Sequence, residues 1–251
     1  MRDLFTLWKH TRMVVLVALV AAVYAAILIP FKVGIPIIPG FTEVRPANVV
    51  PIICSLMFGP AAAWGAAFGN LAGDIFGGTF GPGSAFGFIG NFLYGYVPYK
   101  VWGRMWPLSS RREPFMDSGQ LTEYAAMAVL ASGACAFIIA WGVHALGLVP
   151  FFVLGPAIFL NNFAVLIILG PPLMRVLYPR VRRWGLVYRD VVPDEDLSSG
   201  RLAPLGVILL LLTAVPGLIA GTILGPSYIG VHFTIALAPV VALMLIGCAL
   251  L

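Results

Sequence analysis

The chain has 251 residues, of which 61% are hydrophobic and only 10% are charged, with a formal net charge of +5. A soluble domain carries roughly 25% charged residues, so this composition excludes an ordinary soluble protein and indicates that the chain lies in a lipid bilayer. Bilayer-spanning segments are helices or closed barrels, because every backbone polar group must be bonded within the protein. Long unbroken apolar runs favour helices here.

The residues that usually carry catalysis or bind metals show no functional pattern. The cysteines at 54, 135 and 248 lie in apolar runs without paired spacing, which favours neither a disulfide framework nor a zinc site. The three histidines are far apart in the sequence and lack metal-ligand spacing. No nucleotide-binding loop, dinucleotide fingerprint or nucleophile elbow occurs. We therefore expect no enzyme, no catalytic residue, no metal and no cofactor.

Eight apolar segments predict an all-α integral membrane protein. The first follows Arg2, Lys9 and Arg12 and is longer than the roughly 7–15 residues of a signal-peptide core, so we expect a retained helix. The second is shorter than the ~20 residues of a full crossing, and Pro51 and Pro60 interrupt or bound it, so this helix is expected to be broken or bent. The predicted spans are 13–31, 47–61, 62–79, 84–103, 122–146, 151–176, 203–224 and 232–251.

The basic residues predict the orientation, because Lys and Arg gather on the cytoplasmic side. With a cytoplasmic N-terminus, only Lys32 and Arg45 of the 15 basic residues lie outside. We expect a multi-pass plasma-membrane protein with both termini in the cytoplasm and no nucleic-acid partner. The run "RVRRWGLVYRD" could contact anionic membrane lipid or could be an ordinary cytoplasmic loop. The cytoplasmic set is Arg2, Lys9, Arg12, Lys100, Arg104, Arg111, Arg112, Arg175, Arg180, Arg182, Arg183, Arg189 and Arg201.

In this topology the polar residues of the spans share one depth, the outer half of the membrane, while the inner half holds mostly small and aliphatic residues. Polar groups buried in a membrane usually face a bundle interior or a wet cavity, so the shared depth predicts a substrate pocket. Phe92 is a further ring in this region. The candidate substrate-binding residues are Glu43, Arg45, Asn48, Asn70, Asp74, Asn91, Tyr94, Trp141, His144, Asn161 and Asn162.

Several of these residues have a structural alternative. The Asp74 carboxylate could accept bonds from the glycine loop that follows it, and Asn70 and Asn91 could hold helices together. Trp141 could belong to an interfacial aromatic belt and His144 could cap a helix. In addition, Glu43 and Arg45 could pair with each other, and only one of Asn161 and Asn162 can face inward.

Glycines recur every four residues in the third span, at 65, 69, 73, 77 and 81. This spacing puts a bare stripe on one helix face, where a neighbouring backbone can approach closely. Because the fourth span has glycines at 83, 87 and 95, we expect these two spans to pack as a hairpin. Asn70 and Asp74 are offset from the stripe by one position, toward a cavity. Another small stripe, Ala18, Ala22 and Ala26, could face the bundle or another subunit.

Two stretches, "GFTEVRPANVVP" and "FGPAAAWGAAFGNLAGDIFGG", resemble the substrate-binding S components of energy-coupling factor (ECF) transporters. The resemblance covers roughly residues 13–176. It implies a six-helix protein without its own ATPase that captures a vitamin or related nutrient from outside. It further implies docking of the Ala18, Ala22 and Ala26 stripe on a transmembrane coupling subunit that is bound to two cytoplasmic ATPases. It assigns ligand contacts to Glu43, Arg45, Asn48 and Asp74.

The resemblance predicts three regions: a substrate-binding membrane domain (1–176), a basic cytoplasmic loop (177–202) and a two-helix membrane appendage (203–251). The last two spans exceed the family's six helices. The expected function is ATP-driven import of a vitamin-like or modified-base nutrient through partner subunits. The sequence leaves open whether this is riboflavin, a queuosine precursor, thiamine or a cobalamin. The alternative function is an ion-coupled secondary transporter that uses Asp74.

Overall fold

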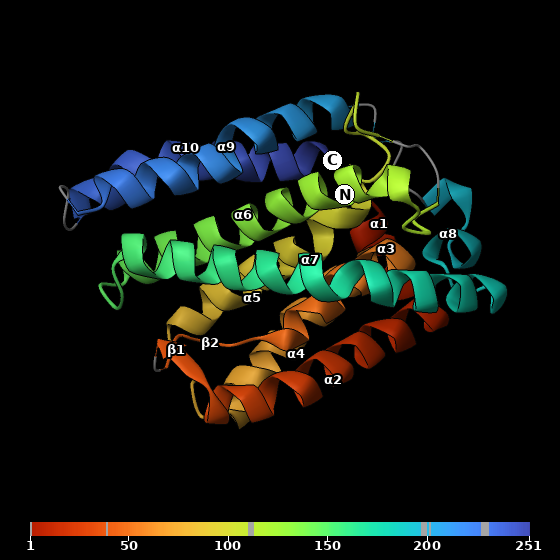
Figure 1. The fold of residues 1–251 in the computed structure, drawn as a ribbon, viewed down its shortest axis with the longest axis horizontal. Coiled ribbons are helices and arrows are strands. Elements are labelled where there is room, and N and C mark those ends of the chain that lie inside the picture. The colour runs from red at the N-terminus through yellow and green to blue at the C-terminus, as the bar shows by residue number, and fades with distance from the viewer. Residues whose placement is uncertain (1, 39, 110–112, 197–199, 201, 227–230) are drawn as a thin grey trace.

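The computed structural model describes residues 2–38, 40–109, 113–196, 200, 202–226 and 231–251. The described chain is a bundle of helices, with one two-stranded antiparallel hairpin (Figure 1). The longer elements are α2 (Thr11–Gly34), β1 (Pro36–Ile38), β2 (Thr42–Glu43), α3 (Val49–Phe58), α4 (Pro60–Phe76), α5 (Gly83–Val101), α6 (Leu121–Ala145), α7 (Phe151–Arg183), α9 (Ala203–Leu224) and α10 (Val231–Leu250). The short helices are α1 (Arg2–Thr6), η1 (Leu7–Lys9), η2 (Pro46–Asn48), η3 (Ser118–Gln120), α8 (Tyr188–Val191) and η4 (Asp194–Asp196).

The fold confirms an all-α integral membrane protein. Five helical segments are long and apolar enough to cross a membrane: Thr11–Lys32, Ser118–Ala145, Phe151–Val191, Ala203–Leu224 and His232–Leu250. The other three predicted spans correspond to α3, α4 and α5, of 10, 17 and 19 residues. The sixth predicted span ended too early, at 176, because the helix α7 continues to Arg183.

The bundle has two distinct ends (Figure 1). We call the end with β1 and β2 the hairpin end, and the opposite end, with α1, α8 and the last turn of α10, the basic end. The long helices run between these two ends in alternating directions.

The second predicted span is a short helix and not a broken one, because α3 runs without interruption from Val49 to Phe58 and Pro51 lies in its first turn. At 1.5 Å per residue, the ten residues of α3 span ~15 Å, about half a hydrocarbon core. All ten are buried, and the 3₁₀ turn η2 precedes them. Gly59 joins α3 to α4 with a φ of +54°, and a Cβ there would lie 2.7 Å from the Tyr188 ring. Because α3 begins inside the bundle, the segment that leads into it from the hairpin reaches the interior.

The expected packing of α4 with α5 is confirmed, but the glycine stripe of α4 faces α2 and not α5 as predicted. A Cβ at Gly65 would lie 2.6 Å from Val20 Cβ, and one at Gly69 would lie 2.9 Å from the Ala21 carbonyl oxygen. The helix α5 does pack on α4, through its own Gly95, which faces the backbone of Ala62. Glycines therefore permit close approach on two faces of α4. The offset face between them carries Asn70 and Asp74.

The C-terminal helices α9 and α10 pack against each other and against α6 (Figure 1). Small residues again allow the contact: a Cβ at Gly133 would meet Val215, and one at Gly217 would meet the Phe137 ring. On the opposite side of the bundle, the Ala18, Ala22 and Ala26 side chains of α2 are exposed. These alanines therefore do not pack inside this chain.

The basic end contains buried polar contacts that the depth argument did not foresee. Asp3 on α1 forms an ion pair with Lys100 at 3.0 Å, and its carboxylate also accepts a hydrogen bond from the Tyr99 hydroxyl at 3.0 Å. The indole N–H of Trp64 donates to the carbonyl of Leu4. These contacts hold α1 against the bundle. The Asp3 and Lys100 charges can be buried there because each is the partner of the other.

Candidate functional site

A cavity of about 200 Å³ opens at the hairpin end, between α2, α4, α5, α6, α7 and the hairpin segment. Its polar residues come from five parts of the chain that are distant in sequence. They are Lys32, Thr42, Arg45, Asn48, Asn70, Asp74, Thr79, Ser84, Asn91 and Asn162. The cavity thus contains six of the eleven predicted substrate-binding residues: Arg45, Asn48, Asn70, Asp74, Asn91 and Asn162.

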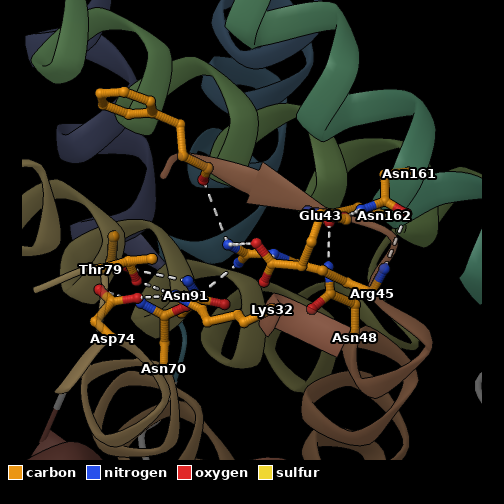
Figure 2. Close-up of polar contacts among 12 residues, drawn as sticks. Lys32, Glu43, Arg45, Asn48, Asn70, Asp74, Thr79, Asn91, Asn161 and Asn162 are labelled. Carbon is orange, nitrogen blue, oxygen red and sulfur yellow. Dashed lines mark hydrogen bonds and ion pairs between the residues drawn. The ribbon is translucent and has the colours of Figure 1, made fainter. Parts of the chain in front are cut away.

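One wall of the cavity is built around Asp74. The Lys32 ammonium forms an ion pair with Asp74 Oδ1 and donates a 2.9 Å hydrogen bond to the Thr79 hydroxyl. The Asn70 amide donates to Oδ2 at 3.4 Å (Figure 2). The glycine loop contacts Asp74 through the backbone, because the Thr79 N–H donates to the Asp74 carbonyl. The alternative that the carboxylate binds the loop N–H groups is therefore wrong in the described structure.

The opposite wall is formed by β2 and the segment that follows it. Glu43 and Arg45 form an ion pair, with 2.8 Å between Oε1 and Nε, as the pairing alternative expected. The Asn161 amide donates to the Glu43 carbonyl at 2.7 Å, which ties this segment to α7. Arg45 Nη1 also donates to the Asn70 side-chain oxygen at 3.3 Å (Figure 2). This last bond connects the two walls.

Asparagines form the inner part of the cavity. The Asn48 amide donates to the Asn162 side-chain oxygen. The Tyr24 hydroxyl lies 2.8 Å from Asn48 Oδ1 and 2.9 Å from Asn91 Oδ1. Because Asn162 lines the cavity while Asn161 holds the hairpin segment, the expectation that only one of the pair faces inward is confirmed. Most of the apolar surface comes from α6, α7 and the loop between them and includes Cys135, Ile139, Val143, Leu148, Leu154 and Ile158.

Three predicted residues and one expected ring have other roles in the structure. The Trp141 indole N–H donates to the Thr234 carbonyl at 3.1 Å, which ties α6 to α10. His144 Nδ1 accepts from the backbone N–H of Phe151, at the start of α7. Tyr94 is fully buried and is not part of the cavity lining. Phe92 packs against Trp64 and Tyr96 and does not line the cavity. The aromatic residue among the lining residues is Phe41.

Sequence reasoning missed Lys32 and Tyr24. Lys32 was counted only as an outer charge, although its side chain is 3% exposed. A signal was available, because Lys32 is the charge nearest the outer end of the first span and Asp74 lies in the outer half of the third span. Tyr24 had no such signal, since a tyrosine in an apolar run does not show which way its hydroxyl points.

The electrostatic balance of the site follows from its ion pairs. Lys32 compensates Asp74 and Arg45 compensates Glu43, so the four charged groups sum to zero. The asparagines add neutral groups that both donate and accept hydrogen bonds. No group of three or more His, Cys, Asp or Glu residues that could hold a metal ion occurs in the described part of the chain. The cavity can therefore hold a small polar molecule by hydrogen bonds along several of its edges.

These features define a multi-pass membrane protein with a buried polar pocket at one end of its bundle, the general form of a small-molecule transporter. The family model described as QueT transporter matches residues 14–179, and the chain belongs to that family. The resemblance to the S components of ECF transporters is thereby confirmed. Helices α9 and α10 lie beyond the matched region. Neither a curated protein nor a solved structure matches the chain.

Proposed function

We propose that this chain is the substrate-binding subunit of an ECF-type importer and that it captures a queuosine precursor, a modified base. The observation that carries the proposal is the asparagine-lined cavity, which lies within the residues that the family model matches. Its volume of about 200 Å³ is below the roughly 300–1,000 Å³ of pockets for drug-sized ligands. This size favours a single substituted ring system over riboflavin or a cobalamin.

In the proposed orientation the basic end faces the cytoplasm and the hairpin end faces outward in the plasma membrane, following the asymmetry of Lys and Arg. The base enters beside the hairpin and is enclosed by the segment from Thr42 to Asn48. This chain carries no nucleotide-binding motif, so a transmembrane coupling subunit and two cytoplasmic ATPases supply the energy. It acts as a carrier of substrate and not as an enzyme.

A binding measurement tests the pocket with a built-in reporter. All three cysteines are buried, and among them only Cys135 lines the cavity. In a Cys54→Ser and Cys248→Ser background, a small thiol reagent should alkylate Cys135, and a saturating queuosine-precursor base should slow this reaction at least about tenfold. Riboflavin and thiamine serve as controls. If no base protects Cys135 and none raises the melting temperature, the proposed substrate is wrong.

A second test concerns the partners. The exposed Ala18, Ala22 and Ala26 face of α2 suits close docking of a neighbouring helix. Ala22→Leu should abolish uptake and leave the dissociation constant of the base unchanged, while Val23→Leu, at an exposed position on another face of α2, should affect neither. Uptake that survives Ala22→Leu would remove this face from the proposal.

The alternative, an ion-coupled carrier that uses Asp74, requires a coupling ion to displace the Lys32 ammonium from the carboxylate. Vesicles separate the two mechanisms. Uptake that needs internal ATP and co-purifying ATPases supports the importer, and uptake driven by an ion gradient without ATP overturns it.

A further inference from the structure

Lys32 and Asp74 form a side-by-side donor and acceptor pair in the cavity wall. Both side chains are almost fully buried, with 3% and 9% exposure, and both line the cavity. Thr79, on the loop between α4 and α5, holds the ammonium, and Asn70, one turn before Asp74, holds the carboxylate. The pair is therefore fixed from two sides.

The hydrogen-bonding capacity of this pair exceeds what the protein uses. An ammonium has three donors. In the described structure Lys32 uses one for Asp74 and one for Thr79, which leaves one. An ionised carboxylate has about four acceptor sites, and Asp74 uses one for Lys32 and one for Asn70 among the described contacts, which leaves two. The wall thus offers one donor beside two acceptors.

This pattern is the complement of one edge of a guanine-type ring. That edge presents a keto oxygen, which accepts, next to a ring N–H and an exocyclic amino group, which both donate. Adenine-type rings present the donor and acceptor in the reverse order, and hypoxanthine-type rings lack the amino group. Queuosine precursors are bases of the 7-deazaguanine type, so the pattern bears directly on the proposed substrate.

The cavity borders both the Asp74 carboxylate and Gly87 of α5. Gly87 on α5 faces this wall, and a Cβ built there would lie 3.0 Å from Asn70 Nδ2 and 3.7 Å from Asp74 Oδ2. A glycine lets a ligand approach the backbone closely. Gly81 also lines the cavity, but a Cβ there would meet no atom within 4 Å.

We infer that Lys32 and Asp74 together read the keto, N–H and amino edge of a guanine-type base, with Lys32 bonded to the keto oxygen and Asp74 to the two N–H donors. The inference rests on the proposed function, since it names the part of that substrate that the pocket recognises. It makes Lys32, which the sequence did not single out, a determinant of specificity.

The test compares three bases on the full-length protein: 7-deazaguanine, 7-deazahypoxanthine and 7-deazaadenine, measured by calorimetry. The wild type should bind 7-deazaguanine at least about tenfold more tightly than either of the others, because an analogue that lacks a partner leaves a buried group unpaired. Asp74→Asn should bring 7-deazaguanine and 7-deazahypoxanthine within about threefold of each other. Lys32→Met should reduce the discrimination against 7-deazaadenine, and Lys32→Arg should restore it.

These ratios separate recognition from a structural role, because a variant that only loosens the fold weakens all three bases alike. Lys9→Met, at an exposed lysine of the basic end, should leave every ratio unchanged. Gly87→Ala should weaken all three bases, whereas Gly81→Ala should not. Equal binding of the three bases to the wild type overturns the edge assignment while the proposed substrate class stands. Binding of none of them, with no queuosine precursor protecting Cys135, overturns both.

Discussion

Because the α4 glycine stripe packs on α2, the effect of Gly73→Ala on the free energy of unfolding should change sign with the residue at position 28. A Cβ at Gly73 would lie 2.6 Å from Leu28 Cδ2 and 3.4 Å from Leu28 Cγ, and Leu28 is fully buried. Overpacking of this kind costs ~1–3 kcal/mol, and alanine gains about 1 kcal/mol over glycine in a helix. Gly73→Ala should therefore lower the free energy of unfolding of the wild type by about 1 kcal/mol.

The same substitution should stabilise a Leu28→Ala protein. Leu28→Ala alone costs ~2–5 kcal/mol, because it leaves a cavity. In that background the new methyl group meets no leucine atoms, so Gly73→Ala should raise the free energy of unfolding by about 1 kcal/mol. The coupling energy between the two positions is then about 2 kcal/mol, within the range for residues in contact.

The assay is reversible denaturant unfolding in mixed micelles, followed by tryptophan fluorescence, for the wild type, both single variants and the double variant. Gly34→Ala is the matched control, since a Cβ there meets no atom within 4 Å. Its effect should be equal in the two backgrounds. If Gly73→Ala also has the same effect in both, within about 0.5 kcal/mol, then the stripe does not face α2 and the packing is wrong.

Three further predictions follow from single contacts. Asn161→Ala removes the hydrogen bond to the Glu43 carbonyl, so limited proteolysis within 36–45 should become faster. Asn162→Ala should leave the proteolysis rate unchanged and should weaken base binding about tenfold. Trp141→Phe should lower the free energy of unfolding by about 1 kcal/mol, because the hydrogen bond to Thr234 is lost, and should leave the dissociation constant of the base unchanged. A large loss of affinity for the base would show that Trp141 contacts the ligand. Asp3→Asn leaves Lys100 without its charged partner and should cost ~3–5 kcal/mol of unfolding free energy, and a cost below 1 kcal/mol would show that this pair is not buried.

The sequence predicted the site as well as it did because membrane depth restricts where polar residues can lie. Asn48, Asn70, Asp74, Asn91 and Asn162 were expected at one level of the bundle, and all five line the same cavity. The depth of a residue in the membrane does not, however, specify toward which side of its helix the side chain faces. Trp141 and His144 share the level of the cavity, yet they contact Thr234 and the start of α7.

The partner of the glycine stripe shows a similar limit. A repeat of four residues predicts a bare face, and the structure has that face. The fourth span was favoured as its partner because it follows directly in the chain and carries glycines. In the structure, Val20 and Tyr24 of α2 occupy the stripe, and α5 uses a different face of α4. Local spacing describes one helix surface, but the choice of neighbour depends on how all surfaces of the bundle fit.

By itself, the sequence determined that the chain lies in a bilayer, where its helices lie, that the second span is short and at which level the polar residues lie, because hydrophobicity and helix length act locally along the chain. Only the tertiary structure decided which polar groups meet. The pairing of Lys32 with Asp74, and of Tyr24 with Asn48 and Asn91, joins residues that are 24 to 67 positions apart. Those contacts depend on the rotation and register of whole helices, which packing sets after each helix has formed.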